Sequence, residues 1–434
     1  MKPVLFVTGH APPDRVGAFA ALHEREDIEV ALYGGRSLHG PDPSGTPERL
    51  DEPASTPWRG EPPSRQAGSP PPREESPLPR TELPFPHKHV SQRATGQLAR
   101  SGAYRAVVCS TGGRVALPST WAGARSEGVP LILWASLWAH PRSVPHMLSY
   151  PPLLALYRSA DAVVTYGPHV SAYVRKRGAR NVHVAPQAVD NAFWSAPADG
   201  APVDPAWPGE AKFKFMFAGR PDREKGIGAL IRAWQRSDLQ ASSAALVLVG
   251  VGSSPPWIPP GGAVDPERER GVRPRVSPRV GVHSGAHPLV GTEAASRAAP
   301  AGVSYIAPVP AGQLREMYAD ADVLVVPSIR TRTFREPWGL VINEAMNRRL
   351  AIIASDAVGA VAGGLVRDGR NGLVVRAGDA EGLAEAMVRL AANPELRGRM
   401  GDAGAIDVGA YTYDAWADGF SKALATVGLS RARC

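Results

Sequence analysis

Cysteine and long apolar runs are scarce in this 434-residue sequence, and both absences restrict the class of protein. The two cysteines, Cys109 and Cys434, imply neither a disulfide framework nor a cysteine metal cluster. No stretch approaches the roughly 20 apolar residues that a membrane span needs. The apolar run after Lys2 is far too short for a signal-peptide core and lacks a cleavage site. We therefore expect a soluble, cytoplasmic protein.

Positive charge is in excess: 49 Lys and Arg residues against 41 Asp and Glu give a net charge of +8. Such an excess favours anionic partners, such as phosphorylated small molecules, nucleic acid or an acidic membrane surface. No nucleic-acid motif or basic-aromatic platform accompanies the charge. We expect no nucleic-acid partner, and at most weak peripheral association with a membrane.

Short runs of Val, Ile and Leu recur along the chain, each ending near a Gly, Ser, Asp or Pro and followed by an Ala/Leu/Arg-rich segment. Continuous apolar runs are typical of strands buried on both faces of a parallel sheet, with helices as the crossovers. The series occurs twice, on either side of a Pro/Gly-rich stretch. We predict an α/β fold of two Rossmann-like, doubly wound domains facing across a cleft. The expected strands are Val4–Gly9, Ile28–Gly34, Ala106–Gly112, Leu131–Ser136, Ala162–Tyr166, Val182–Pro186, Lys214–Gly219, Ala245–Gly250, Val303–Ala307, Val323–Ser328, Ala351–Asp356 and Gly372–Val375.

The same division gives the expected domains. Residues 1–200 form the N-terminal, acceptor-side domain and residues 210–410 the C-terminal, donor-side domain, while 411–434 form a helix that returns to the N-terminal domain. Residues 41–98 and 253–300 are dense in Pro, Gly and charge, and bury too little apolar surface to offset the entropy of ordering. We expect both to be largely disordered insertions.

Candidate phosphate-binding cations follow the first strand of the second series. The strand ends at Gly219, where a ligand could approach the backbone closely. Arg220 and Lys225 then place two cations where a diphosphate could be held. A solvated loop with ordinary surface charges explains these residues equally well.

Two glutamates stand out further along, in Glu336-Pro-Trp-Gly-Leu-Val-Ile-Asn-Glu344. On one continuous helix they would lie about 80° apart. Pro337 and Gly339 instead place Glu336 in the loop before a helix and Glu344 in its first turns. Both carboxylates could then accept hydrogen bonds from sugar hydroxyls, and the free amides of the helix start could bind phosphate.

Several of these segments, taken in order, resemble glycosyltransferase family four, a group of retaining enzymes with the GT-B fold. Gly219-Arg220 with Glu224-Lys225-Gly226 is similar to its phosphate-binding signature, and Glu336-x7-Glu344 to its best-known motif. Pro186-Gln-Ala-Val-Asp190 resembles the element that ends the N-terminal domain. Val323–Ser328 and Asp368–Leu373 resemble the strand before and the turn after the glutamate motif.

The resemblance implies a role for each matching residue. Arg220 and Lys225 would neutralise the donor diphosphate without a metal, Glu336 would bind the transferred sugar, and Glu344 the ribose. The implied donor site comprises Gly219, Arg220, Lys225, Gly250, Ala307, Ser328, Glu336, Trp338, Gly339, Leu340 and Glu344. The resemblance further implies that the leaving phosphate helps to deprotonate an acceptor attacking from the same face.

The match is looser in the N-terminal domain. The segment 9–17 follows the first strand, where the family has a Gly-rich loop near the donor phosphate and the acceptor. Gly17 is the counterpart there, and Asp14 and Arg15 are candidate acceptor contacts.

Two further candidates follow the strand at 131–135. Trp138 could stack against an acceptor sugar, although core packing is an alternative. His140 is the nearest match to the family's histidine near the reacting carbon, which would make it catalytic together with Glu336, Arg220 and Lys225. A solvated surface histidine is an even alternative.

The resulting hypothesis is a metal-independent, retaining glycosyltransferase of the hexosyltransferase type. It takes a nucleotide-diphosphate sugar as co-substrate, needs no other cofactor, and acts on an acceptor that the sequence does not identify. A nucleotide-sugar epimerase of the same fold would act without an acceptor, and the glutamate pair argues against it. A non-catalytic nucleotide-sugar-binding protein is the third possibility. Acceptor-dependent release of nucleoside diphosphate distinguishes the three.

Overall fold

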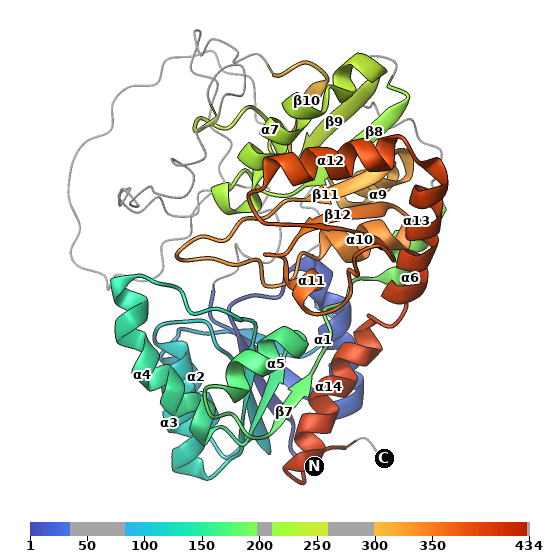
Figure 1. Cartoon of the computed structure of the whole chain (residues 1–434). Helices are drawn as coiled ribbons and strands as arrows, with labels where there is room; N and C mark the ends of the chain where they lie inside the picture. Colours follow the sequence, from blue (N-terminus) through green and yellow to red (C-terminus); the bar gives the residue numbers. More distant parts are fainter. Residues whose placement is uncertain (35–82, 198–210, 259–298, 432–434) are drawn as a thin grey trace, which may run out of the picture.

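The computed structural model describes residues 1–34, 83–197, 211–258 and 299–431. Two parallel sheets, each covered by helices, form the two halves of the molecule, the N-terminal half below and the C-terminal half above in Figure 1. The predicted α/β class with two Rossmann-like domains is confirmed.

The N-terminal sheet has the strand order β3-β2-β1-β4-β5-β6-β7, and every neighbouring pair is parallel. Its inner strands β1, β2, β4, β5 and β6 are almost wholly buried because helices cover both faces, which explains their continuous apolar sequences, whereas the edge strands β3 and β7 are partly exposed. The elements of this half are β1 (Val4–Thr8), α1 (Pro13–Glu26), β2 (Ile28–Leu32), β3 (His87–His89), α2 (Ala94–Ala99), β4 (Ala106–Ser110), α3 (Ala116–Glu127), β5 (Leu131–Ala135), α4 (Val144–Ser159), β6 (Ala162–Thr165), α5 (Pro168–Arg175) and β7 (Val182–Val184).

The C-terminal sheet is also fully parallel, with the order β10-β9-β8-β11-β12-β13. A short helix, α6 (Asn191–Ser195), leads into this half, and its Trp194 packs in the C-terminal core. The remaining elements are β8 (Phe213–Ala218), a 3-10 turn at Arg223–Lys225, α7 (Ile227–Ser237), a 3-10 turn at Leu239–Ser242, β9 (Ala244–Val249), β10 (Val303–Ile306), α9 (Ala311–Asp320), β11 (Val323–Val326), α10 (Val341–Asn347), β12 (Ala351–Ser355), α11 (Gly359–Ala362), β13 (Gly372–Val375), α12 (Ala380–Ala391), α13 (Pro394–Val408) and α14 (Tyr413–Thr426).

The last helix belongs to the core of the first sheet. In Figure 1, α14 (red) leaves the C-terminal half and lies against α1 (blue). Its Trp416 and Phe420 are fully buried, with ring centroids 5.6 Å from Phe19 and 5.4 Å from Phe6, respectively. The N-terminal core is therefore completed by a helix from the far end of the described chain.

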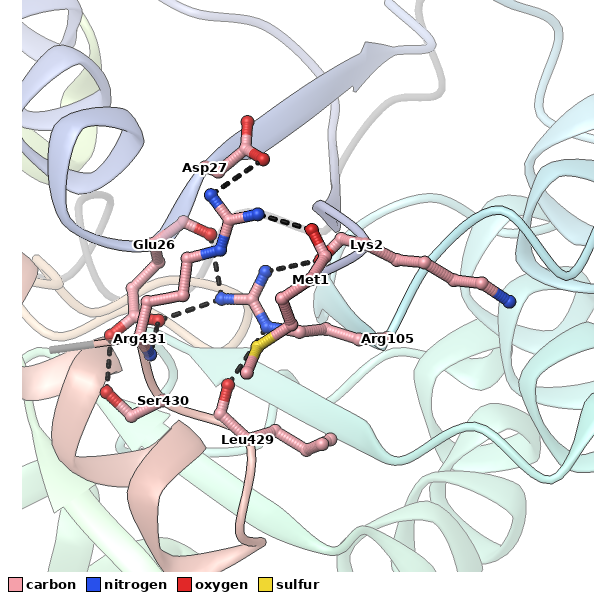
Figure 2. Close-up of polar contacts among 8 residues, drawn as sticks. All are labelled: Met1, Lys2, Glu26, Asp27, Arg105, Leu429, Ser430 and Arg431. Carbon is pink, nitrogen blue, oxygen red and sulfur yellow. Dashed lines mark hydrogen bonds and ion pairs between the residues drawn. The ribbon is translucent and has the colours of Figure 1, made fainter.

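A buried carboxylate ties this helix's end to the start of the chain (Figure 2). Glu26 is fully buried and pairs with Arg105 at 2.8 Å. It also accepts hydrogen bonds from the Ser430 hydroxyl and the Arg431 amide, at 2.7 and 2.9 Å. Arg105 donates in turn to the carbonyls of Lys2 and Leu429. Such a buried ion pair is supported on every side by hydrogen bonds, which offset its desolvation.

Residues 83–98 contain a strand and the start of a helix, although we expected residues 41–98 to be largely disordered. Strand β3 pairs with β2 through His87–His89 at the edge of the sheet, and α2 begins at Ala94. Backbone pairing and the buried Phe85 order this stretch despite its polar sequence. The expectation of disorder for residues 41–82 and 259–298 falls outside the described part of the chain, as does most of the Pro/Gly-rich stretch between the two series.

Candidate active site

An ion pair between Lys225 and Glu336 lies where strands β8 and β11 of the C-terminal sheet end. The Lys225 Nζ is 2.5 Å from the Glu336 Oε2, and the Ser328 hydroxyl lies 3.4 Å from the same oxygen. Glu336 is only 7% exposed. Three residues proposed from the sequence thus meet in one cluster. A cation and a carboxylate here could bind a phosphate and a sugar hydroxyl, respectively.

Two glycines make this cluster possible. Gly226 follows Lys225 with φ +76°, and a Cβ atom there would lie 2.0 Å from the carbonyl of Pro327. Gly359 would place a Cβ atom 1.9 Å from the carbonyl of Pro337. Only glycine lets the chain approach this closely, so each fixes one of the loops that carry Lys225 and Glu336.

Glu344 lies on α10 and is buried rather than open. It accepts a hydrogen bond from the Tyr318 hydroxyl at 3.0 Å. Burial raises the pKa of Glu344 to about 7, the bond from Tyr318 opposes the rise, and the nearby charge of Asp14 adds to it. This side chain therefore changes charge near neutral pH.

The structure separates Arg220 from the cluster. Its side chain is 75% exposed and pairs with Asp222 at 3.1 Å. Among the described residues, no hydrogen bond or ion pair joins Arg220 to Lys225 or Glu336. Arg220 and Lys225, the two cations proposed to bind the diphosphate, therefore have different partners in this structure, Asp222 and Glu336 respectively.

The other donor-side candidates lie along the carboxyl edge of the same sheet. Gly219 ends β8 and Gly250 ends β9, and a Cβ atom on Gly250 would come within 2.7 Å of the Gly219 carbonyl. Ala307 follows β10 directly. Glycine at 250 therefore lets the backbone segments that follow β8 and β9 approach each other closely.

The glutamate loop is the place where the two halves meet. The indole NH of Trp138, which follows β5, donates to the Glu336 carbonyl at 3.1 Å. His169, at the start of α5, makes a 3.2 Å hydrogen bond to the Pro337 carbonyl. Its ring lies between those of Trp138 and Trp338, with centroids 5.3 and 6.0 Å away. Trp138 thus contacts the loop that carries Glu336, and it does so through the NH at the edge of its indole ring.

His169 was not among the sequence candidates. Burial lowers its pKa, against the smaller effect of the Pro337 carbonyl, so the neutral ring is favoured. The signal in the sequence is slight: a Gly-Pro-His turn after the strand at 162–165. Its importance depends on a partner loop about 170 residues away.

Arg15 and Gln187 form a second contact region between the halves. The buried Gln187 accepts a hydrogen bond from the Arg15 guanidinium, and its backbone carbonyl accepts one from Asn343 at 2.9 Å. Asn343 also accepts from the indole NH of Trp338 at 2.8 Å. The sequence predicted Arg15 and Trp338 as site residues but not this chain of contacts.

A pocket of about 370 Å³ opens at the carboxyl edge of the N-terminal sheet. It is lined by Asp14 and Arg15 together with hydroxyl and aromatic side chains, among them Ser110, Ser136 and Tyr166. The Nη1 of Arg15 and the Nε1 of Trp134 are buried with no hydrogen-bond partner in the described structure. Both residues line the pocket, although these two nitrogen atoms are themselves closed off from solvent.

Gly17 and His140 lie elsewhere than the resemblance implied. A Cβ atom on Gly17 would be 2.2 Å from the ring of Tyr413, so this glycine makes room for α14. The His140 ring packs on Tyr150 at 4.5 Å and bonds to the carbonyl of His146 at 2.8 Å. His140 thus contacts the start of α4, and in the described part of the chain no hydrogen bond joins it to Glu336.

Comparison with known proteins agrees with this architecture. Residues 281–406 match the family described as glycosyl transferases group 1. The chain is 27% identical over 316 residues to the lipopolysaccharide core biosynthesis glycosyltransferase LpsE of Rhizobium meliloti (strain 1021), covering 70% of this chain and 74% of that one. Over 115 residues it is 36% identical to the D-inositol 3-phosphate glycosyltransferase of Streptomyces coelicolor, which is 26% of this chain but only 23% of the relative.

Among solved structures, Anabaena HepE in complex with UDP and glucose is similar over 98% of this chain and 100% of its own, with a TM-score of 0.62 and 14% identity. At that identity the likeness establishes the fold, which is GT-B. The group 1 match, the relatives and the fold together support a glycosyltransferase with the GT-B fold.

Proposed function

We propose that the protein is a retaining glycosyltransferase that moves a sugar from a nucleotide-diphosphate sugar to an acceptor bound by the N-terminal domain. The observation that carries the proposal is the partly buried Lys225–Glu336 pair, 2.5 Å long, at the carboxyl edge of the C-terminal sheet. Glycosyltransferase relatives, and the similar structure of HepE in complex with UDP and glucose, support a nucleotide-sugar donor.

The pair is suited to exchange partners when a donor binds. A diphosphate entering beside Lys225 offers the ammonium a stronger anion than a single carboxylate. Glu336 is then released to accept hydrogen bonds from hydroxyls of the sugar. Arg220, exposed and flexible beside Gly219, could turn onto the phosphates at small cost because its present partner is an exposed Asp222.

Chemistry would follow from the same groups. The bond between the anomeric carbon and the phosphate oxygen breaks, and negative charge grows on the diphosphate. Lys225 and Arg220 stabilise that charge, so no metal is required in this proposal. The acceptor hydroxyl attacks from the same face as the leaving group, and its proton passes to the departing phosphate oxygen.

The N-terminal pocket is proposed to hold the acceptor. Its lining combines Arg15 and Trp134, residues with nitrogen donors, with the hydroxyl groups of Thr8, Tyr33, Ser110, Thr111, Ser136 and Tyr166. Donors in this number favour a ligand rich in oxygen, such as a sugar or polyol. Asp14, which faces the same pocket, could accept a hydroxyl proton in return.

Thermal-shift measurements with UDP, GDP, ADP and TDP test the donor site without knowledge of the acceptor. We expect one nucleotide to stabilise the protein, by about 2.7 kcal/mol at 100 times its Kd. Replacing Lys225 by Gln should weaken that nucleotide about tenfold or more, because one charge-assisted contact is lost.

The matched control is Lys422→Gln, which also removes a lysine that pairs with a carboxylate, here the exposed Asp418 on α14. It should leave nucleotide binding unchanged. The proposal fails if none of the four nucleotides stabilises the wild-type protein, or if Lys225→Gln responds to the nucleotide as the control does.

A further inference from the structure

The start of α4 presents an unusual set of exposed apolar side chains. Val144, Met147 and Leu148 are 71%, 67% and 75% exposed, and we call them the apolar tip. Their spacing of three and four residues puts them on one side of the helix. The other large exposed apolar residues of the described chain are scattered singly, as is normal for a protein surface.

The apolar tip is held in place by polar contacts behind it. The Ser143 hydroxyl lies 2.7 Å from the His146 Nδ1, and the His140 Nε2 bonds to the His146 carbonyl at 2.8 Å. The Tyr150 ring packs on His140. The first turns of α4 are therefore fixed, and they stand at the outer edge of the N-terminal half in Figure 1. Nothing in the described structure covers the three apolar side chains.

Positively charged residues lie next to the apolar tip along the chain and in a loop that the preceding segment contacts. The Arg142 amide donates to the Arg332 carbonyl at 2.6 Å, so the loop before α4 meets the loop after β11. Arg330 and Arg335 belong to that second loop, and we call these four residues the arginine rim. Burial lowers the pKa of Arg335, and the nearby charges of Arg330 and Arg142 lower it further. Within the described residues, Arg330 is the one rim guanidinium that pairs with a carboxylate, that of Asp356.

This combination matches an anionic lipid bilayer. Apolar side chains on a protruding helix can enter the boundary between headgroups and acyl chains, while adjacent arginines attract anionic lipids. A stable protein partner would need a surface of roughly 20–30 residues on each side. Three side chains at the end of a convex helix offer far less. We propose that the apolar tip and the arginine rim together form a docking surface for an anionic membrane.

Both halves of the molecule contribute to this surface. Arg142 comes from the N-terminal half, whereas Arg332 and Arg335 come from the loop that ends in Glu336. Arg335 also lies 5.2 Å over the ring of Trp138, which contacts that glutamate's carbonyl. Docking would therefore hold the Glu336 loop close to the lipid headgroups.

Sedimentation of the full chain with lipid vesicles tests the proposal, without nucleotide or acceptor, so its outcome does not depend on the proposed activity. We expect binding to vesicles that contain phosphatidylglycerol and little binding to pure phosphatidylcholine. The triple variant Val144→Ser, Met147→Ser, Leu148→Ser should bind at least about tenfold more weakly. Replacing Arg142 and Arg332 by Gln should weaken binding about fivefold for each residue at low salt.

The matched control is the double variant Ile406→Ser, Arg399→Gln on α13, since Ile406 is 74% exposed and Arg399 is exposed as well. It should bind vesicles as the wild type does. Equal melting temperatures would show that all variants are folded. The proposal is overturned if the wild type does not sediment with anionic vesicles, if the triple variant binds as the control does, or if phosphatidylcholine alone binds equally well.

Discussion

The carboxyl group of Glu344 is expected to make stability depend on pH in a way that one substitution can isolate. Burial raises its pKa from the ordinary 4.5 to about 7. Above pH 4.5 the unfolded chain releases this proton while the folded protein keeps it until about pH 7. Folding therefore becomes less favourable as the pH rises through this window, and the loss is complete above it.

The size of the effect follows from the shift. The difference between 4.5 and about 7, at 1.36 kcal/mol per pKa unit, corresponds to about 3 kcal/mol. Glu344→Gln removes the titration but keeps an oxygen that can accept the Tyr318 hydrogen bond. The variant should thus gain about 3 kcal/mol of stability relative to the wild type between pH 5 and pH 8.

Urea unfolding at several pH values, from pH 5 to above pH 8, measures this difference, because all other titrating groups are shared and cancel. Glu385→Gln, which removes an exposed glutamate of α12, controls for the loss of one negative charge. A difference between wild type and Glu344→Gln that stays constant across the pH range would refute the account of Glu344.

Two further substitutions test the packing that supports the site and the fold. Glu26→Ala should lower the free energy of unfolding, measured in urea, by about 3–5 kcal/mol because it leaves Arg105 buried without its partner. The control Asp418→Ala breaks an exposed pair and should lower it by less than about 1 kcal/mol. Similar losses in the two variants would contradict the assigned role of the Glu26 cluster. Gly359→Ala should lower the melting temperature and weaken nucleotide binding, since its methyl group would strike the Pro337 carbonyl. The control Gly398→Ala, on an open face of α13, should stabilise the protein by roughly 0.5–1 kcal/mol. If Gly359→Ala were the more stable of the two variants, the Pro337 loop would not require glycine at position 359.

The strands could be predicted because a strand buried on both faces leaves a continuous apolar run in the sequence. All twelve expected runs contain strands of the two sheets. The exception, β3, reads His-Lys-His and lies at a sheet edge with an exposed side. Its position depends on backbone pairing with β2, which side-chain pattern does not encode.

The site could be predicted in part, for a related reason. Parallel strands gather their carboxyl ends, so Lys225, Ser328 and Glu336 were expected at one edge, and the structure brings them together. The sequence could not predict that the Arg220 side chain would face solvent, or that Gly17 would leave room for the Tyr413 ring. The hydrogen bonds of His169 and Gln187 to the C-terminal half form only when the two halves dock. The spacing of residues along the chain does not predict which residues meet at that contact.

The position of α14 has a consequence for how the protein is made. On the ribosome, the first sheet emerges long before this helix, so Phe6 and Phe19 must wait for Trp416 and Phe420 to arrive. Until α14 has been translated, the earlier part of the chain exposes an aromatic surface to the cell's chaperones. The core of the N-terminal half, which is translated first, is thus completed only after α14 has been made.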